Sequence, residues 1–280
     1  MKMDDTDPQS SKRRPVAEAN LFLDDFRTGE LDRTKWNVVT TGAVYNRELQ
    51  AYVDEERTVS LAASGDVEGS TTGALVLAAH HVPGFTTYDG QTFNFVSGRL
   101  DTRRKFAFRY GRAAARMELP AGIGLWPAFW ALGEGRWPQS GEIDIMESIG
   151  DPAWVSAAVH GPDYCGESAL VNRYYFDARH PATSWHVYSL DWKPDEMTFR
   201  VDGVITYRVI RPMVEFLGNW VFDDEKYLIL NLALGGTYPF KTHGTAAPYY
   251  GLEQDTLETI QAGQANVYVD WVRVHGLLSP

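Results

Sequence analysis

The sequence of 280 residues holds a single cysteine, Cys165, so no disulfide can form within the chain. It also lacks any apolar run of the 18 or more residues that a membrane-spanning helix needs. Positive charge is scarce, with 26 Lys and Arg against 37 Asp and Glu and a formal net charge of -11. Nucleic acids and anionic membranes attract basic surfaces, so we expect neither as a partner.

Residues 1–19 are rich in charge, Ser and Pro and carry no aromatic ring, a composition typical of a disordered lead-in. The basic residues 12–14 are not followed by a hydrophobic segment, so no export signal is recognised in the chain as given. We expect a single domain over residues 20–276 and a short tail at 277–280.

Short apolar segments separated by Gly, Pro and polar turns predict an all-β protein. Alternating runs at 186–192, 197–201 and 204–209 follow one another closely, and Asp202-Gly203 between the last two is a strong hairpin signal. They predict an antiparallel three-stranded meander. The spacing of the other segments favours a sandwich or a barrel.

Two long segments interrupt this strand pattern. Residues 80–95 are rich in Gly, Thr and Asp, and we expect them to form a loop. Residues 237–264 are expected to be irregular, apart from a short helix within 252–261.

Three carboxylates, Glu142, Asp144 and Glu147, lie on one apolar segment with no Lys or Arg between them. Alternate residues of a strand share a face, so Glu147, five positions after Glu142, would point away from the other two. One extra residue corrects this parity. We therefore predict a β-bulge at residues 145–146, which returns Glu147 to the carboxylate face and leaves Ile143 facing the core. The alternative is a solvated sheet face, which usually mixes charges of both signs.

The composition supports a site for carbohydrate. The chain has nine Trp, fourteen Tyr and thirteen Phe, and aromatic rings stack against the pyranose faces of sugars in binding grooves. Paired carboxylates in such a groove suit glycoside hydrolysis, in which one is the nucleophile or base and the other donates a proton. Clustered acids also bind calcium, but Ca²⁺ prefers ligands from a flexible loop to ligands from an apolar strand.

Two further segments add candidate groove residues. Trp126 and Trp130 share a face just before the acidic strand, either as core residues or as a ligand platform. Asn231 interrupts the apolar run 227–234, which is typical of a buried central strand. A buried Asn needs partners, so it either caps backbone groups or binds a hydroxyl in the groove.

Together these motifs resemble glycoside hydrolase family 16, and in particular its laminarinase-like endo-β-1,3-glucanases. The resemblance covers roughly residues 21–275. The segments that carry it are GEIDIME at 141–147, GLWPAFW at 124–130, SGR at 97–99 and VDWVRV at 269–274. It implies a β-jelly-roll sandwich of two curved antiparallel sheets, concanavalin A-like, with a substrate cleft across the concave face and retention of anomeric configuration.

The resemblance also implies roles for individual residues. Glu142 matches the nucleophile, Glu147 the general acid/base, and Asp144 the carboxylate that orients the nucleophile. For Arg99 the alternative is a surface charge, and for His160 a satisfied core imidazole. The full set of matching cleft positions, which would bind substrate, is Asn46, Arg99, Trp126, Trp130, Trp137, His160 and Asn231.

The resemblance implies no cofactor for catalysis, but it does imply a structural calcium on the convex side. Asp270 matches its carboxylate ligand, and Asp25 and Gly73 match its backbone carbonyl ligands. The chain departs from the family pattern after His160, where residues 161–167 read GPDYCGE.

The bulged form of the acidic motif is associated with laminarinases, agarases and carrageenases. It favours β-1,3-glucan as the substrate, with mixed β-1,3-1,4-glucan as a side activity. Two alternatives within the family are a hydrolase of galactans such as agar or carrageenan and a transglycosylase. A third is a lectin-like module that binds glucan without cutting it, although such modules typically lose one or both catalytic glutamates. The polysaccharide substrate leads us to expect an extracellular location, although no export signal is recognised. We expect the protein to be a monomer.

Overall fold

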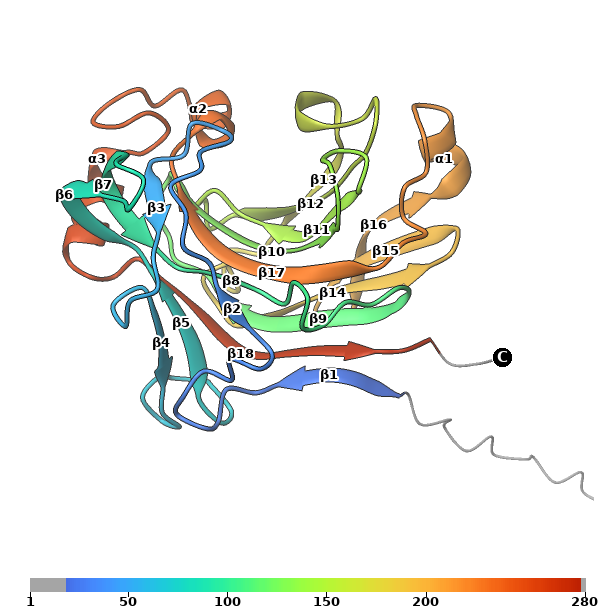
Figure 1. Cartoon of the computed structure of the whole chain (residues 1–280), viewed down its shortest axis with the longest axis horizontal. Coiled ribbons are helices and arrows are strands. Elements are labelled where there is room, and N and C mark those ends of the chain that lie inside the picture. The colour runs from blue at the N-terminus through green and yellow to red at the C-terminus, as the bar shows by residue number, and fades with distance from the viewer. Residues whose placement is uncertain (1–18, 278–280) are drawn as a thin grey trace, which may run out of the picture.

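The computed structural model of the chain describes residues 19–277, so the predicted lead-in at 1–19 and tail at 277–280 lie almost wholly outside the described residues. Two antiparallel sheets pack face to face, and a third, smaller sheet lies at one end (Figure 1). This arrangement confirms the predicted jelly-roll sandwich. No helix in the described part is long and apolar enough to cross a membrane.

The outer, convex sheet has eight strands in the order β16-β15-β14-β9-β18-β5-β4, with β1 paired to β18. Their bounds are β1 (Asn20–Asp24), β4 (Val59–Ala62), β5 (Ala74–Ala78), β9 (Gly111–Glu118), β14 (His186–Lys193), β15 (Glu196–Val201), β16 (Val204–Ile210) and β18 (Asn266–His275). The predicted meander is confirmed as β14, β15 and β16. Its last turn has positive φ at both Asp202 and Gly203, as a tight hairpin turn requires.

The inner sheet has seven strands in the order β13-β12-β11-β10-β17-β8-β2 and forms the concave floor seen from its edge in Figure 1. The three-stranded sheet has the order β3-β7-β6. Their bounds are β2 (Asn37–Val38), β3 (Gln50–Tyr52), β6 (His80–Thr86), β7 (Thr92–Ser97), β8 (Arg99–Asp101), β10 (Leu125–Gly133), β11 (Glu142–Glu147), β12 (Trp154–His160), β13 (Leu170–Tyr175) and β17 (Lys226–Leu234).

In strand β17, packing against the core determines which side chains face the concave side of the inner sheet. All nine of its residues are buried, which confirms the prediction of a central strand at 227–234. The leucines at 228, 230, 232 and 234 belong to the core between the sheets. Each fully buried leucine side chain contributes roughly 1.5–3 kcal/mol to folding. Because side chains alternate along a strand, the same packing turns Asn231 towards the concave face.

Two expectations about irregular segments were wrong in part. Residues 80–95 are not a loop, since β6 and β7 pair as a hairpin whose register shifts between His81 and Phe85. Pro83 and Gly84 fall inside that shift, where neither residue has to keep a regular ladder. The expected helix within 252–261 is confirmed as α3 (Gln254–Gln261).

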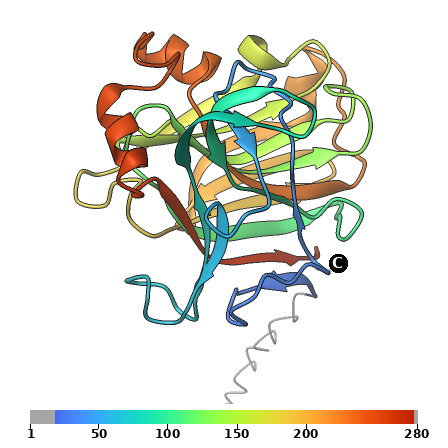
Figure 2. The same cartoon turned by 60° about the vertical axis from the view of Figure 1, so that its left-hand side comes forward.

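Four short helices complete the described part of the chain. Helix α2 was not predicted, because it is short and carries a proline in its first turn. Helices α2 and α3 gather on one side of the sandwich (Figure 2). The bounds are η1 (Gly166–Ser168), α1 (Arg211–Glu215), α2 (Thr237–His243) and α3 (Gln254–Gln261).

Candidate active site

The acidic strand β11 contains the predicted bulge. Asp144 pairs with Ala158 of β12 and Glu147 pairs with Ser156, so three steps on β11 face two steps on β12. The extra residue falls at 145–146, where parity required it.

Both outer carboxylates of β11 point to the concave side. The indole N–H of Trp126 donates to Glu147 Oε1 at 3.0 Å, and that of Trp137 donates to Glu142 Oε2 at 3.1 Å. Ile143 is fully buried in the core between the sheets, as predicted. The parity argument is therefore confirmed, and each glutamate has its own indole donor.

His160 joins the carboxylates from β12. Its Nε2 lies 3.1 Å from Asp144 Oδ2 and 3.7 Å from Glu142 Oε1. The backbone N–H of Gly166 donates to its Nδ1, so in the neutral imidazole the proton sits on Nε2 and faces the acids. The ligand atoms of Glu142, Asp144 and His160 lie within 4.8 Å of one another, an arrangement that could also hold a metal ion.

Burial dominates the protonation of this group. It raises the pKa of Glu142 to about 8, and the charge of Asp144 adds to the rise, while His160 opposes it. Burial likewise raises the pKa of Asp144 and of Glu147 to about 8, and for Glu147 the Asp144 charge again adds. Crowded acids of this kind share protons and titrate as a unit, so at neutral pH the group holds at least one proton.

A second polar cluster lies on the floor beside β11. Trp130 Nε1 donates to Asn231 Oδ1 at 2.7 Å, and Asn231 Nδ2 donates to Tyr52 Oη at 3.2 Å. The Arg99 guanidinium lies 5.1 Å from the centroid of the Trp130 ring and 5.8 Å from that of Tyr52. Asn231 therefore serves a side-chain cluster rather than capping the backbone.

Two groups of this cluster, Arg99 Nε and the Tyr52 hydroxyl, can still donate a hydrogen bond to a ligand. Arg99 Nε is buried and has no hydrogen-bond partner among the described residues. Burial raises the pKa of the Tyr52 phenol, which stays protonated and remains a donor. Tyr52 was missed by the sequence analysis, since 179 residues separate it from Asn231 and no local pattern marks it.

Asn46 does not reach the carboxylates. Its backbone N–H and side-chain amide both donate to Glu48, and its carbonyl accepts from the N–H of Thr237 at the start of α2. Its side chain is exposed. The structure therefore places Asn46 at the rim beside α2, apart from the other predicted cleft residues.

Tyr238 of α2 is a site residue that the sequence analysis missed. Its hydroxyl lies 3.2 Å from Ser156 Oγ on β12, and its ring meets Trp126 edge to face at 5.5 Å between centroids. Burial raises its pKa, and the charge of Glu147 adds to the rise. It lies in a segment expected to be irregular, where the sequence offered no signal for it.

The residues implied as calcium ligands meet on the convex side through segment 71–73. The first Thr of this segment donates its N–H and its hydroxyl to Asp270, and the second donates its hydroxyl to the Asp25 carbonyl at 2.8 Å, next to Gly73. Arg116 Nη1 also bonds the fully buried Asp270, at 2.6 Å. Asp270 is thus already balanced within the chain, and these residues offer an ion no uncompensated carboxylate.

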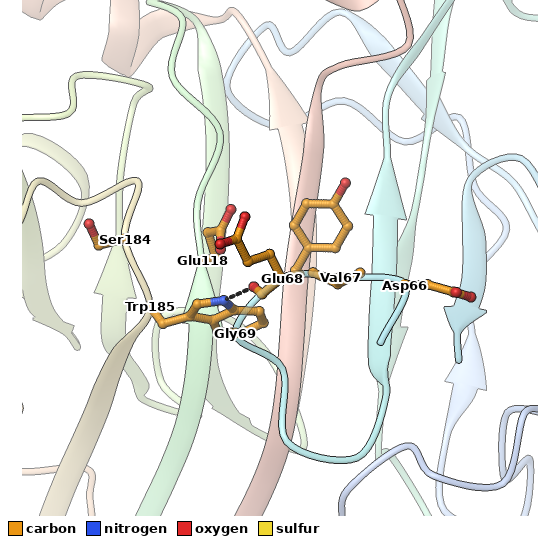
Figure 3. A pocket seen from close by; sticks show the side chains of 8 residues that line it. Asp66, Val67, Glu68, Gly69, Glu118, Ser184 and Trp185 are labelled. Atoms are coloured by element: carbon orange, nitrogen blue, oxygen red, sulfur yellow. Dashed lines mark hydrogen bonds between the residues drawn. The ribbon is translucent and has the colours of Figure 1, made fainter. Parts of the chain in front are cut away.

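The convex side also carries a hollow of about 530 Å³ beneath the 63–73 loop, lined in part by Glu68, Glu118 and Trp185 (Figure 3). Trp185 Nε1 donates to the Glu68 carbonyl at 2.8 Å and holds the loop against the sheet. Burial raises the pKa of Glu118, and the Glu68 charge adds to the rise. The hollow is lined by residues of the outer sheet and its loops, and the carboxylates of β11 do not line it.

The sequence of the chain matches a known family of glycoside hydrolases. Glycosyl hydrolases family 16 matches residues 45–231. The chain belongs to this family. Family 16 hydrolases need no catalytic cofactor, so the carboxylates of β11 and their neighbours are the chemical groups to consider.

Individual relatives agree with the family. The chain is 33% identical over 271 residues to a beta-glucanase of Rhodothermus marinus, covering 91% of this chain and 84% of that protein. It is 34% identical over 229 residues to a beta-1,3-glucan-binding protein of Penaeus monodon, covering 64% of this chain and 62% of that one. The structure of an endo-beta-1,3-glucanase from Pyrococcus furiosus matches with a TM-score of 0.78 and 32% identity, covering 93% and 95% of the two chains. This family 16 chain is a glycoside hydrolase that resembles endo-β-1,3-glucanases.

Proposed function

We propose that the chain is a retaining endo-hydrolase of β-1,3-linked glucan, with mixed β-1,3-1,4-glucan as a side activity. The observation that carries this proposal is the bulge of β11, which turns Glu142 and Glu147 to one face, each beside its own indole donor. Two carboxyl groups on one face are what double displacement at an anomeric carbon needs.

The first chemical step forms a glycosyl-enzyme. The Glu142 carboxylate attacks the anomeric carbon, the glycosidic bond breaks, and Glu147 gives its proton to the departing oxygen. In the second step the Glu147 carboxylate takes a proton from water, whose oxygen attacks the same carbon and releases Glu142. The two inversions leave the anomeric configuration unchanged.

The surroundings of the two glutamates support this division of roles. Glu142 accepts from Trp137 and faces the Nε2–H of His160, and both contacts favour its ionised form. Burial and the Asp144 charge raise the pKa of both glutamates to about 8, so a proton is available for Glu147 to donate. Once Glu142 is an ester its charge is gone, so the pKa of Glu147 falls and it becomes the base of the second step. Asp144 acts on both glutamates through its charge.

The cluster of Arg99, Trp130, Asn231 and Tyr52 supports a glucan as the ligand. It offers an aromatic surface together with polar groups that can meet sugar hydroxyls. The similarity to the Pyrococcus endo-beta-1,3-glucanase favours the β-1,3 linkage.

Chemical rescue tests the two roles. Glu142→Ala and Glu147→Ala should each lower kcat on an activated β-glucoside of a β-1,3-glucan oligosaccharide by about 10³-fold or more. Azide should restore the activity of both variants. With Glu142→Ala the product should be the α-glycosyl azide, of inverted configuration, and with Glu147→Ala it should be the β-glycosyl azide, of retained configuration. The reverse assignment of the two products would exchange the roles of the glutamates.

A binding protein without hydrolysis is the second candidate, favoured by the similarity to the Penaeus protein. Incubation with laminarin, barley glucan, lichenan, agarose and carrageenan, followed by a reducing-sugar assay, separates the candidates. Release from laminarin as a ladder of short products supports the endo-glucanase. Binding of laminarin without release supports the binding protein, and release from agarose alone would show a galactan hydrolase.

A further inference from the structure

The two ends of β11 lead to two different sets of loops, which form the two rims of the concave face. At one end Glu142 pairs with His160, and the loop 161–169 with η1 continues from there. At the other end Glu147 pairs with Ser156, which contacts Tyr238 of α2. Loop 161–169 and α2 therefore stand at opposite ends of the acidic strand, and Figure 1 shows α2 at one rim of the concave sheet.

An ion pair connects these rims. Lys241 of α2 reaches Glu167 of η1, and the side chains of the two residues are 47% and 81% exposed. The contact joins residues that are 74 positions apart in the sequence and that belong to the two rims. Glu167 is the last residue of the segment 161–167, whose sequence differs from the pattern of the resembling family.

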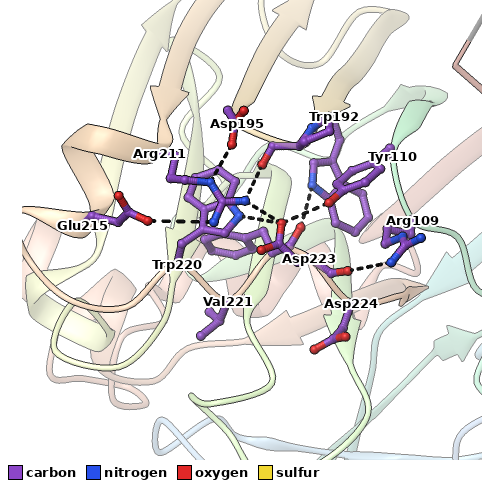
Figure 4. Close-up of polar contacts among 12 residues, drawn as sticks. Arg109, Tyr110, Trp192, Asp195, Arg211, Glu215, Trp220, Val221, Asp223 and Asp224 are labelled. Atoms are coloured by element: carbon purple, nitrogen blue, oxygen red, sulfur yellow. Dashed lines mark hydrogen bonds and ion pairs between the residues drawn. The ribbon is translucent and has the colours of Figure 1, made fainter.

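Both ends of the connection are held in place. On the η1 side the hydroxyl of Tyr164 donates to the Asn219 carbonyl at 2.7 Å. The segment that carries Asn219 is fixed in turn by Arg211 and Tyr110, which bond Asp223 at 2.6 and 3.0 Å (Figure 4).

On the α2 side the ring of Phe240 stacks on Tyr250 at 4.3 Å, and the Arg47 guanidinium lies 3.9 Å from the centroid of the same Tyr250 ring. Lys241 therefore extends from a helix whose neighbouring residue is packed in place. Because both anchors are held, only the two long side chains need to move to open the connection.

Both segments that carry the pair contact β12, because Gly166 bonds His160 and Tyr238 lies 3.2 Å from Ser156. The concave floor continues from there to β13. Ser156 and Ala158 of β12 lie beside Arg173 and Val171 of β13, and the two β13 side chains are exposed. The Arg173 guanidinium lies 4.0 Å from the centroid of the Trp154 ring. In the order of the inner sheet, β12 and β13 lie on the opposite side of β11 from β17 and β8, which carry Asn231 and Arg99.

We propose that Glu167 and Lys241 determine specificity by closing over the β12–β13 half of the cleft. A single unbranched glucan chain fits beneath the pair, whereas a branch on a sugar in this half has to displace it. An exposed ion pair changes such an equilibrium by roughly two- to fivefold, which sets the size of the preference for unbranched chains. This inference rests on the proposed hydrolysis of β-1,3-glucan.

The test compares kcat/KM on a linear β-1,3-glucan oligosaccharide with kcat/KM on a β-1,3-glucan that carries β-1,6 branches. Glu167→Gln and Lys241→Met each remove one charge at nearly constant length. We expect each to raise the branched-to-linear ratio about two- to fivefold. The charge swap E167K/K241E should return the ratio to that of the wild type, because it restores the pair with reversed polarity.

Asp177→Asn is the matched control, because it breaks an exposed ion pair with Arg179 between β13 and β14, without a link between the rims. Its ratio should equal that of the wild type. An equal ratio in all variants, with the wild type active, overturns the specificity proposal alone. A rise in Asp177→Asn as large as that in Glu167→Gln overturns it too, since net charge would then explain the effect. A wild type that cuts neither substrate overturns the proposed function itself.

Discussion

The indole N–H of Trp126, at the start of β10, donates to Glu147 Oε1 at the bulged end of β11, over a distance of 3.0 Å. This bond favours the ionised carboxylate, whereas burial favours the protonated one. The balance between the two decides at which pH Glu147 can donate a proton.

Trp126→Phe keeps the ring and removes the donor. The pKa of Glu147 should rise further, because a hydrogen bond that lowers it is lost while burial and the Asp144 charge, which raise it, remain. A hydrogen bond to a charged group is worth roughly 1.5–3 kcal/mol, so the alkaline limb of kcat/KM should move up by about one to two pH units. A pH–rate profile measures the shift, and an alkaline limb at lower pH would contradict it.

Asp144→Asn should have the opposite effect. The Asp144 charge raises the pKa of both Glu142 and Glu147, next after burial. Without it both pKa values fall, so the acid and alkaline limbs of the profile should both move to lower pH. If the maximum of kcat/KM falls while the pH of both limbs is unchanged, Asp144 acts by positioning the glutamates rather than by its charge.

Glu142→Gln should stabilise the protein at neutral and alkaline pH. Burial raises the pKa of Glu142 from 4.5 to about 8, so the folded state prefers the protonated form. The stability that this preference represents is fully present below pH 4.5 and is lost as pH rises towards about 8, by at most about 1.4 kcal/mol per pH unit. The neutral amide avoids that loss.

Thermal melting from pH 4 to pH 9 measures this difference. The Tm of Glu142→Gln should exceed that of the wild type by a margin that grows as pH rises. Glu30→Gln, which neutralises an exposed carboxylate, is the control, and its Tm should equal that of the wild type at every pH. A margin that is constant across pH would point to packing rather than ionisation.

Arg116→Met should be strongly destabilising. Asp270 is fully buried and Arg116 is its ion-pair partner, so the variant leaves a buried carboxylate without a counter-charge. Breaking such a pair costs about 3–5 kcal/mol. Urea unfolding measures the loss, and a double variant R116M/D270N, which removes both charges, should recover part of it.

Chelation tests the structural calcium implied for Asp25, Gly73 and Asp270. Because Arg116 already balances Asp270, we expect dialysis against chelator to leave the melting midpoint unchanged. A fall in midpoint that added calcium reverses would show instead that an ion binds at the backbone carbonyls and contributes to stability by mass action.

The bulge could be predicted from the sequence because side-chain direction in a strand depends on parity alone. Counting from Glu142 to Glu147 is enough to require one extra residue, and the pairing with β12 has it. The meander β14 to β16 was predictable for a similar reason, since the Asp202-Gly203 turn is a local signal.

The hairpin of β6 and β7 and the helix α2 were not predictable in this way. In β6 the turn-forming Pro83 and Gly84 fall within a strand, where pairing to β7 outweighs their local preference. Helix α2 has only seven residues and depends on contacts such as Phe240 with Tyr250 rather than on its own propensity.

The sequence by itself determined the antiparallel β class, the meander and the shared face of the three acids, because alternation and turn chemistry are properties of short segments. Its patterns left sandwich and barrel open, and the resemblance to the family pointed to the sandwich. Only the tertiary structure decided that Tyr52 completes the Asn231 cluster, that Tyr238 stands beside Glu147, and that Glu167 meets Lys241 across the cleft. These contacts join segments tens to hundreds of residues apart. Their geometry follows from how the two sheets pack and curve, which no single segment encodes.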